Sequence, residues 1–242
     1  MHKVALLAAV AAVGAVGVTG VAHAVDADQG LAVSSTSKKA GTPAKPKNLV
    51  KLTVTTTTTP HEAAPAYATQ KAIIHFDKNM VFGSAKFPSC TKAQAEAVPI
   101  SPKCAAAKVG SGSATAVVAA INANPTLKVT AYNGPGGKKL WLLVTEPTFQ
   151  INSVLDGTLS SDTGKYGKKL TVLIPANLQQ PIPGVYATLT SFSTSVGGTA
   201  TKAKVPYVAL KGCTGSNLNY GGDFYFTDGD VKKVTATSKC TK

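Results

Sequence analysis

The residues with the clearest chemical potential are His75 and Asp77, which lie two positions apart in segment 71–77. Side chains alternate along a strand, so both would lie on one face and could form an imidazole–carboxylate pair. Hydrolysis of the Ser-His-Asp type would also need a nucleophile. The chain has no G-x-S-x-G segment, and residues 110–112 (GSG) are typical of a tight turn. His75 and Asp77 are therefore the catalytic candidates, although the pattern favours a structural role for them.

Other chemistries lack the residues that they require. Glycosidases place two carboxylates across a cleft, and Glu146 and Asp156 would do so only with a suitable strand pairing. Apart from the first 24 residues, the histidines are His61 and His75, and neither H-E-x-x-H nor C-x-x-C occurs. The glycine turns lack the Lys-Ser/Thr and the following helix of a phosphate loop. We predict no metal site and no cofactor.

The four cysteines, Cys90, Cys104, Cys213 and Cys240, form an even set. In an oxidising compartment such a set indicates disulfides, and four cysteines allow three pairings. We favour the local pairing, Cys90–Cys104 and Cys213–Cys240, for which the chain-entropy model gives about 3 kcal/mol per bond. A zinc site is the alternative, but neither His61 nor His75 lies near a cysteine pair in the sequence.

Strands must position these residues, because β-branched and alternating segments dominate the chain after residue 48. Strands are expected at 49–59, 71–77, 115–121, 127–132, 140–145, 149–155, 170–174, 185–192, 205–210, 224–227 and 231–237. Turns are expected at 133–137, 156–157 and 228–230, and a short helix at 91–97 inside the first disulfide loop. The pattern predicts an all-β antiparallel sandwich or barrel. We favour a β-sandwich of about ten strands, in a jelly-roll or immunoglobulin-like two-sheet form.

The N-terminal segment predicts secretion. A basic start is followed by the apolar run Val4–Val21 and a small-x-small site at residues 22–24. Residues 1–24 are therefore expected to be a signal peptide cleaved after Ala24, which leaves no transmembrane anchor. The alternative is an uncleaved anchor, because the apolar run is long enough to span a bilayer.

The remaining chain divides by composition. Residues 25–48 are rich in Ser, Thr, Lys and Pro, which predicts a flexible leader. Residues 49–242 are expected to form a single β domain, and a division near 181–184 is the alternative.

The charge is strongly basic, with 25 Lys+Arg against 11 Asp+Glu and a formal net charge of +14. All the basic residues are Lys, which is a hydrated point charge without the planar fork of Arg. This favours diffuse attraction to an anionic cell-wall polymer or envelope surface over specific readout of nucleic acid. The alternative is that scattered lysines serve solubility.

A further pattern consists of residues 73–77 (IIHFD), 87–90 (FPSC), a second cysteine and residues 109–114 (VGSGSA). In this order the chain, from about Leu49 to Cys240, resembles an uncharacterised family of secreted β-rich proteins from high-GC Gram-positive bacteria. Members commonly have Pro directly after the second cysteine, whereas Ala105 stands here. The resemblance implies a secreted, disulfide-bonded β fold and no particular activity.

The function expected from the sequence is that of a secreted, non-enzymatic β protein of the cell envelope or extracellular space, which binds anionic wall polymer through Lys. Two alternatives stay open: a small hydrolase acting on extracellular glycan through His75 and Asp77, and an adhesion or protein-binding module.

Overall fold

The computed structural model describes residues 26–49, 51–61, 67–200 and 205–242, so the predicted signal peptide lies outside the described residues. Within them, eleven strands form one large sheet. They are β1 (Ala27–Ser35), β3 (Lys51–Pro60), β4 (Thr69–Asp77), β6 (Lys108–Val117), β7 (Thr126–Asn133), β8 (Lys139–Glu146), β9 (Ile151–Ser161), β10 (Tyr166–Leu173), β11 (Thr188–Gly197), β15 (Asn217–Phe226) and β16 (Val231–Lys239). The predicted all-β antiparallel fold is confirmed.

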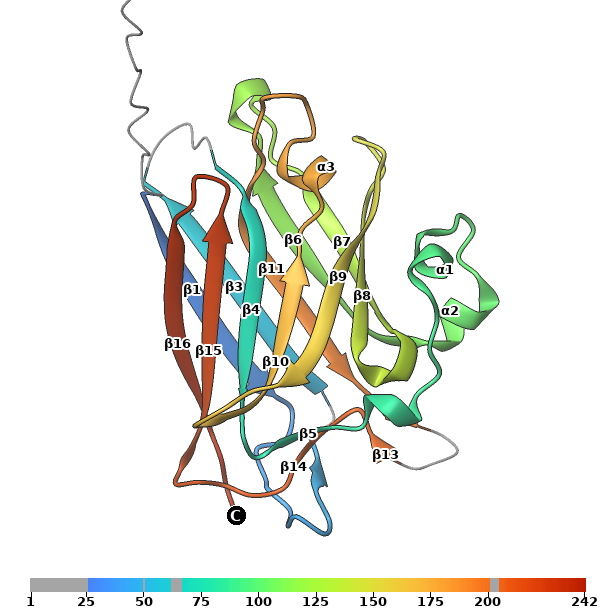
Figure 1. The fold of residues 1–242 in the computed structure, drawn as a ribbon, viewed down its shortest axis with the longest axis vertical. Coiled ribbons are helices and arrows are strands. Elements are labelled where there is room, and N and C mark those ends of the chain that lie inside the picture. Colours follow the sequence, from blue (N-terminus) through green and yellow to red (C-terminus); the bar gives the residue numbers. More distant parts are fainter. Residues whose placement is uncertain (1–25, 50, 62–66, 201–204) are drawn as a thin grey trace, which may run out of the picture.

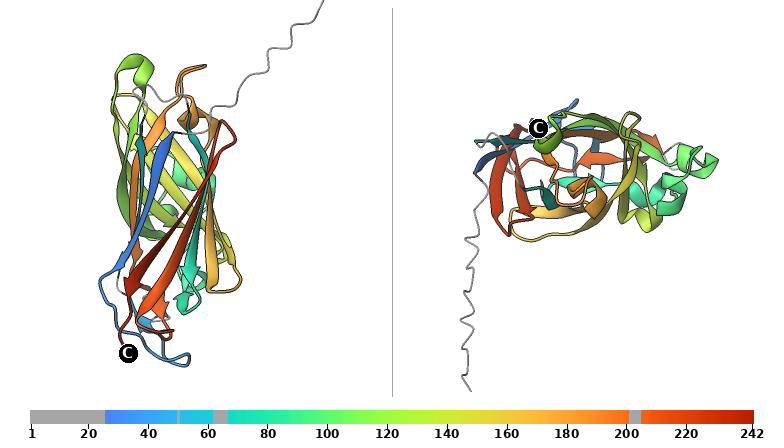
Figure 2. Two further views of the ribbon diagram at one scale, coloured as in Figure 1. Left: turned by 90° about the vertical axis from the view of Figure 1, so that its left-hand side faces the viewer. Right: turned by 90° about the horizontal axis from the view of Figure 1, so that it is seen from above.

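The large sheet closes almost completely on itself. Its strands follow the order β1-β3-β11-β6-β7-β8-β9-β10-β4-β15-β16. The two edge strands, β1 and β16, lie beside each other, and the sheet forms a nearly closed barrel (Figure 1). Seen from above, the barrel is flattened (Figure 2). The predicted two-sheet sandwich was therefore wrong. Alternation identifies one buried face per strand, but it does not determine whether that face packs on a second sheet or inside a barrel.

The predicted flexible leader was wrong over Ala27–Ser35, which is strand β1 and pairs along its length with β3. Ala27 and Val33 are buried, and Leu31 packs against the core. These apolar residues alternate with polar or small ones, so the average composition of the segment resembles that of a disordered chain. The threonine-rich β3 supplies the hydrogen-bonding partner that the sequence of β1 alone does not reveal.

Shorter elements complete the fold. A three-stranded sheet contains β2 (Lys47–Asn48), β14 (Val208–Leu210) and β5 (Met80–Phe82), and a two-stranded one contains β12 (Thr199–Ala200) and β13 (Val205–Pro206). The α-helices are α1 (Lys92–Glu96), α2 (Pro102–Ala106) and α3 (Ala176–Gln179), and the 3-10 helices are η1 (Ser84–Lys86), η2 (Ala119–Ile121) and η3 (Pro135–Gly137). In the described part of the chain, no helix has the length and apolar character needed to cross a membrane.

Local signals were read correctly at some positions and incorrectly at two. Residues 133–137 join β7 to β8 and residues 228–230 join β15 to β16, as the turn residues predict. By contrast, residues 110–112 lie inside β6, and residues 156–157 lie inside β9. A Cβ on Gly157 would be 2.6 Å from the carbonyl oxygen of Leu140, so this glycine allows close strand packing and not a turn.

The chain between β5 and β6 covers the outside of the barrel. Its helix α1 begins with the predicted cap, since the Thr91 hydroxyl accepts a hydrogen bond from the Gln94 N–H and the Gln94 side chain accepts one in return. The disulfide Cys90–Cys104 closes this segment, as predicted. Trp141 of β8 packs against it and donates from its indole nitrogen to the Cys90 carbonyl oxygen at 2.9 Å. The segment thus forms a second small core on the outer face of the sheet.

The two ends of the barrel differ. We call the base the end at which β1, β4 and β16 finish, at the bottom of Figure 1, and the mouth the opposite end, at which β6, β8 and β10 finish. The three-stranded sheet lies at the base, and α3 lies at the mouth.

Candidate functional site

Lysines gather at the base, on strand ends and connecting loops. We call ten of them the basal lysines: Lys38, Lys39, Lys45, Lys47, Lys51, Lys78, Lys165, Lys211, Lys239 and Lys242. All of them except Lys211 are exposed. They come from both halves of the sequence, so only the closure of the barrel brings them to one end of the molecule.

Backbone hydrogen bonds join the segments that carry these lysines. The Lys78 N–H donates to the carbonyl oxygen of Lys165 at 3.2 Å, which joins the β4–β5 turn to the β9–β10 turn. The Lys211 N–H donates to the Asn79 carbonyl oxygen at 2.9 Å, which adds the segment after β14. Three basic side chains from distant parts of the chain are therefore held in neighbouring positions.

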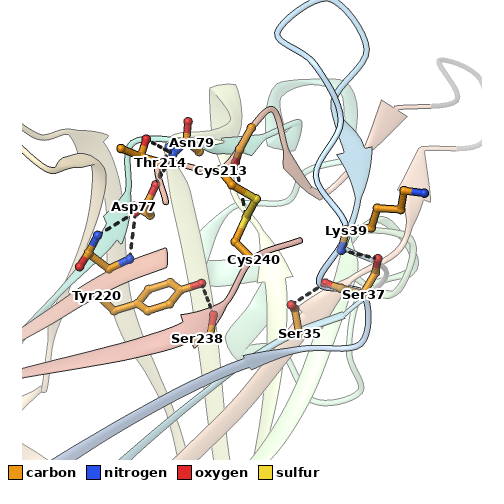
Figure 3. The surroundings of a disulfide bond; sticks show 12 residues. Ser35, Ser37, Lys39, Asp77, Asn79, Cys213, Thr214, Tyr220, Ser238 and Cys240 are labelled. Atoms are coloured by element: carbon orange, nitrogen blue, oxygen red, sulfur yellow. Dashed lines mark hydrogen bonds between the residues drawn. A yellow bond between two sulfur atoms is a disulfide. The ribbon is translucent and has the colours of Figure 1, made fainter. Parts of the chain in front are cut away.

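The end of the chain adds further lysines to the same surface. The Thr241 N–H donates to the Lys38 carbonyl oxygen at 2.9 Å, and the Ala40 N–H donates to the Thr241 carbonyl oxygen at 2.7 Å. The predicted disulfide Cys213–Cys240 fixes this segment against the start of β15 (Figure 3). The disulfide and these hydrogen bonds together therefore hold Lys39, Lys239 and Lys242 in one region.

Carboxylates do not neutralise the basal lysines in the described structure. The ion pairs formed by lysines there are Lys92–Glu96 at 3.6 Å, Lys139–Asp156 at 2.7 Å and Lys232–Asp230 at 3.3 Å. None of these lysines is a basal one. Two carboxylates are close to basal lysines in the sequence, Asp77 beside Lys78 and Asp162 near Lys165. Asp77 accepts hydrogen bonds from Asn79, and Asp162 is hydrogen-bonded to His75.

Asp77 is a buried carboxylate that organises the base. It is 1% exposed and accepts four hydrogen bonds. Its Oδ1 accepts from the backbone and side-chain nitrogens of Asn79, both at 2.9 Å, and its Oδ2 accepts from those of Asn219 at 2.9 and 3.4 Å. Asn79 also donates to the Thr214 hydroxyl at 3.0 Å (Figure 3). Asp77 thus connects the turn after β4, the start of β15 and the disulfide loop.

His75 lies on the outer wall of the barrel and does not contact Asp77 through a hydrogen bond. Its Nδ1 is 2.5 Å from Asp162 Oδ2 and its Nε2 is 3.4 Å from Asp223 Oδ2. The ring of Tyr166 stacks on the imidazole with centroids 5.0 Å apart. Because carboxylates face both ring nitrogens, neither nitrogen is open to accept a proton from a nucleophile. The arrangement is that of a hydrogen-bonded cluster that links β4 to β15 and to the β9–β10 turn.

Asp162 shows the electrostatic effect of this pairing. Partial burial by itself would raise the pKa of its carboxyl, but the hydrogen bonds from His75 and from the Thr163 N–H outweigh that effect. The pKa of Asp162 is therefore lower than its ordinary value, as expected for a carboxylate that is stabilised in its charged form.

Two other sequence candidates lie apart. Glu146 is at the mouth end of β8, where it accepts from the Phe149 N–H at 2.6 Å, whereas Asp156 lies in the middle of β9 and pairs with Lys139 at the start of β8. Glu146 is opposite Ile151 in the sheet, so five residues of β9, or about 16 Å, separate it from Asp156 along the strand direction. These carboxylates do not face each other across a cleft.

His61, which the sequence did not assign to a site, has two acidic partners in the structure. Its Nδ1 is 2.8 Å from Asp26 Oδ1 and its Nε2 is 3.1 Å from Asp28 Oδ2, all on the exposed surface. These hydrogen bonds, first that of Asp26 and then that of Asp28, raise the pKa of His61 above its ordinary value. The i, i+2 spacing of the two aspartates was the available signal, since it places both on one face of a strand.

No group of three or more His, Cys, Asp and Glu residues in the described ranges could hold a metal ion. Comparison of the chain with protein-family models, with curated proteins and with solved structures finds no match. The candidate functional site therefore rests on the basal lysines themselves, and the resemblance seen in the sequence remains a prediction.

Proposed function

We propose that the protein is a secreted, non-enzymatic component of the cell envelope or extracellular space that binds an anionic polymer through its base. The observation that carries this proposal is the gathering of ten lysines at one end of the barrel without ion-pair partners among the described carboxylates. A polymer that bears phosphate or carboxylate groups would supply the missing negative charge along an extended surface.

The opposite end of the barrel has a different charge. Asp26, Asp28, Glu146, Asp228 and Asp230 lie there, together with the lysines Lys71, Lys128, Lys232 and Lys233. Among the described residues, the ten basal lysines lie near two carboxylates, Asp77 and Asp162, whereas the mouth carries more carboxylates than lysines, so positive charge gathers toward the base. A uniform distribution would be sufficient for solubility, whereas a one-sided distribution orients the molecule toward a negative surface.

The chemistry of lysine determines the kind of recognition that we expect. Each ammonium group is a flexible point charge, so the base would follow the charge density of a polymer and not its sequence or stereochemistry. Such binding weakens as salt screens the charges, because exposed groups interact over about 8–10 Å at physiological ionic strength.

The test compares two variants of equal charge. Lys39→Gln/Lys239→Gln removes two basal lysines, and Lys128→Gln/Lys233→Gln removes two exposed lysines near the mouth. At about 1 kcal/mol for each lysine close to an anionic surface, the basal variant should bind about thirtyfold more weakly than the wild type. The mouth variant should stay within about threefold. Equal losses in both variants would show that net charge, and not the base, determines binding.

The probes are inorganic polyphosphate and polyglutamate, measured separately by fluorescence anisotropy at low salt. Preferential binding of polyphosphate would indicate a phosphate-containing wall polymer, and preferential binding of polyglutamate would indicate a carboxylate polymer. If neither probe binds at low salt, the proposed function is wrong.

A further inference from the structure

The inside of the barrel contains two adjoining cavities. The inner one has about 110 Å³ of space open to the centre of a water-sized molecule, and the one at the mouth has about 180 Å³. They share lining residues, including Leu155, Ile174, Leu189 and Phe192, so they adjoin each other in the middle of the barrel. A dry cavity of about 150 Å³ is large enough to hold benzene, so the two together suit a longer molecule.

The lining of these cavities is apolar, and the charged residue among its described members is Lys139. Its Nζ donates to Asp156 Oδ1 at 2.7 Å and to the Thr158 hydroxyl at 2.8 Å, so this charge is already paired. An ionised ligand group would therefore be buried without a counter-charge. The chemistry of the lining selects a neutral molecule.

One hydroxyl in the lining lacks a partner. Thr194, on the inward side of β11, is 8% exposed, and its Oγ1 has no hydrogen-bond partner among the described residues. On the outward side of the same strand, the hydroxyls of Ser193 and Ser195 are bonded to those of Thr55 at 2.9 Å and Thr53 at 2.7 Å. A buried hydroxyl is costly when it is unpaired. This oxygen has less than 1 Å² of accessible surface, so a ligand oxygen would satisfy the Thr194 hydroxyl after the side chain turns toward the cavity.

The mouth offers an apolar entrance. Ile121, Phe149 and Ile182 are 46%, 45% and 41% exposed and also line the outer cavity. They belong to three different connections: the one after β6, the β8–β9 turn and the segment that follows α3. Figure 2, in its view from above, shows the segment with α3 lying across this end of the barrel. Large apolar side chains around an opening favour the entry of an apolar molecule from that end.

We propose that the barrel binds a neutral aliphatic molecule with one oxygen function, such as a medium-chain alcohol, ketone or ester. The hydrocarbon part occupies the two cavities, and the oxygen exchanges a hydrogen bond with the Thr194 hydroxyl. The entrance of this site, at the mouth, is at the opposite end from the basal lysines, and the site is independent of the proposed polymer binding.

The test uses octan-1-ol and octane, each titrated into the full chain and followed by NMR of the leucine methyl groups. Octan-1-ol should bind the wild type saturably, with shifts at Leu155 and Leu189. Thr194→Val should weaken octan-1-ol binding by about two- to tenfold, the range of one neutral hydrogen bond, and should leave octane binding unchanged. Ala116→Leu, which places a larger side chain in the outer cavity, should weaken the binding of both molecules.

Three results would overturn the proposal. The first is the absence of saturable octan-1-ol binding by the wild type. The second is an equal effect of Thr194→Val on the binding of the alcohol and of the alkane, which would show that Thr194 forms no hydrogen bond with the alcohol. The third is unchanged binding of both molecules to Ala116→Leu, which would place them outside the barrel. The comparison of Ala116→Leu with the wild type tests the proposal even if Thr194→Val does not fold.

Discussion

Substitution of Asp77 tests whether this carboxylate stabilises the base of the barrel or is instead a catalytic residue with little effect on stability. In Asp77→Ala the carboxylate that accepts four hydrogen bonds from Asn79 and Asn219 is lost. The two side-chain amides can turn toward water, but the two backbone N–H groups keep their direction. At about 1.5–3 kcal/mol for each hydrogen bond to a charged group, these two alone correspond to about 3–6 kcal/mol. We expect the free energy of unfolding to fall by about 4 kcal/mol.

Urea unfolding with both disulfides intact provides the measurement. Asp77→Asn keeps one acceptor oxygen but directs an NH₂ group toward the other donors, so it should cost about half as much. Asp223→Asn, on neighbouring β15, is the control and should change stability by less than about 1 kcal/mol, because Asp223 is 3.4 Å from His75 and partly exposed. If Asp77→Ala lies within about 1 kcal/mol of the wild type, the structural role of this carboxylate is refuted.

Two further predictions concern His61 and the first disulfide. NMR titration of His61 should give a pKa above the ordinary value of 6.5, and Asp26→Asn/Asp28→Asn should return it toward that value. Because the pKa is raised in the folded state, the contribution of these pairs to stability is complete below pH 6.5 and is lost as the pH rises through the folded-state pKa. A measured pKa of His61 at or below 6.5 in the wild type would contradict the two hydrogen bonds seen in the structure. Cys90→Ala/Cys104→Ala should lower the free energy of unfolding by about 3 kcal/mol, since the bond closes a loop with a sequence separation of 14. Calorimetry of the oxidised wild type and the variant measures this difference, and equal stabilities would show that the packing of Trp141 is sufficient to hold the segment.

Much of the local structure was readable from residue types. The Thr91 cap, the turns at 133–137 and 228–230 and both disulfides followed from signals within a few residues or from the parity of the cysteines. The errors arose where the structure depends on contacts between strands that are distant from each other in the sequence. Strand β1 depends on β3, and the barrel depends on β1 lying next to β16, neither of which leaves a periodic signal in the sequence.

The candidate site, likewise, could be predicted from the sequence only in part. The excess of lysine was evident from composition, but its concentration at the base required the barrel to bring Lys78, Lys165 and Lys211 together. His75 and Asp77 do share the outer face of β4, as alternation predicts, yet their partners come from β15 and from the turns that flank the barrel. The unpaired hydroxyl of Thr194 could not be recognised in advance, because its neighbours are known only from the fold.

The central claim is that the base holds an anionic polymer by charge. Its most direct test is the dependence of polyphosphate affinity on salt concentration, measured for the wild type and for Lys39→Gln/Lys239→Gln. A linear fall of the logarithm of affinity with the logarithm of salt concentration is expected, and the slope of the basal variant should be smaller by about 2, or about 1 for each lysine removed. An affinity that does not change with salt, or an identical slope for both proteins, would contradict the claim.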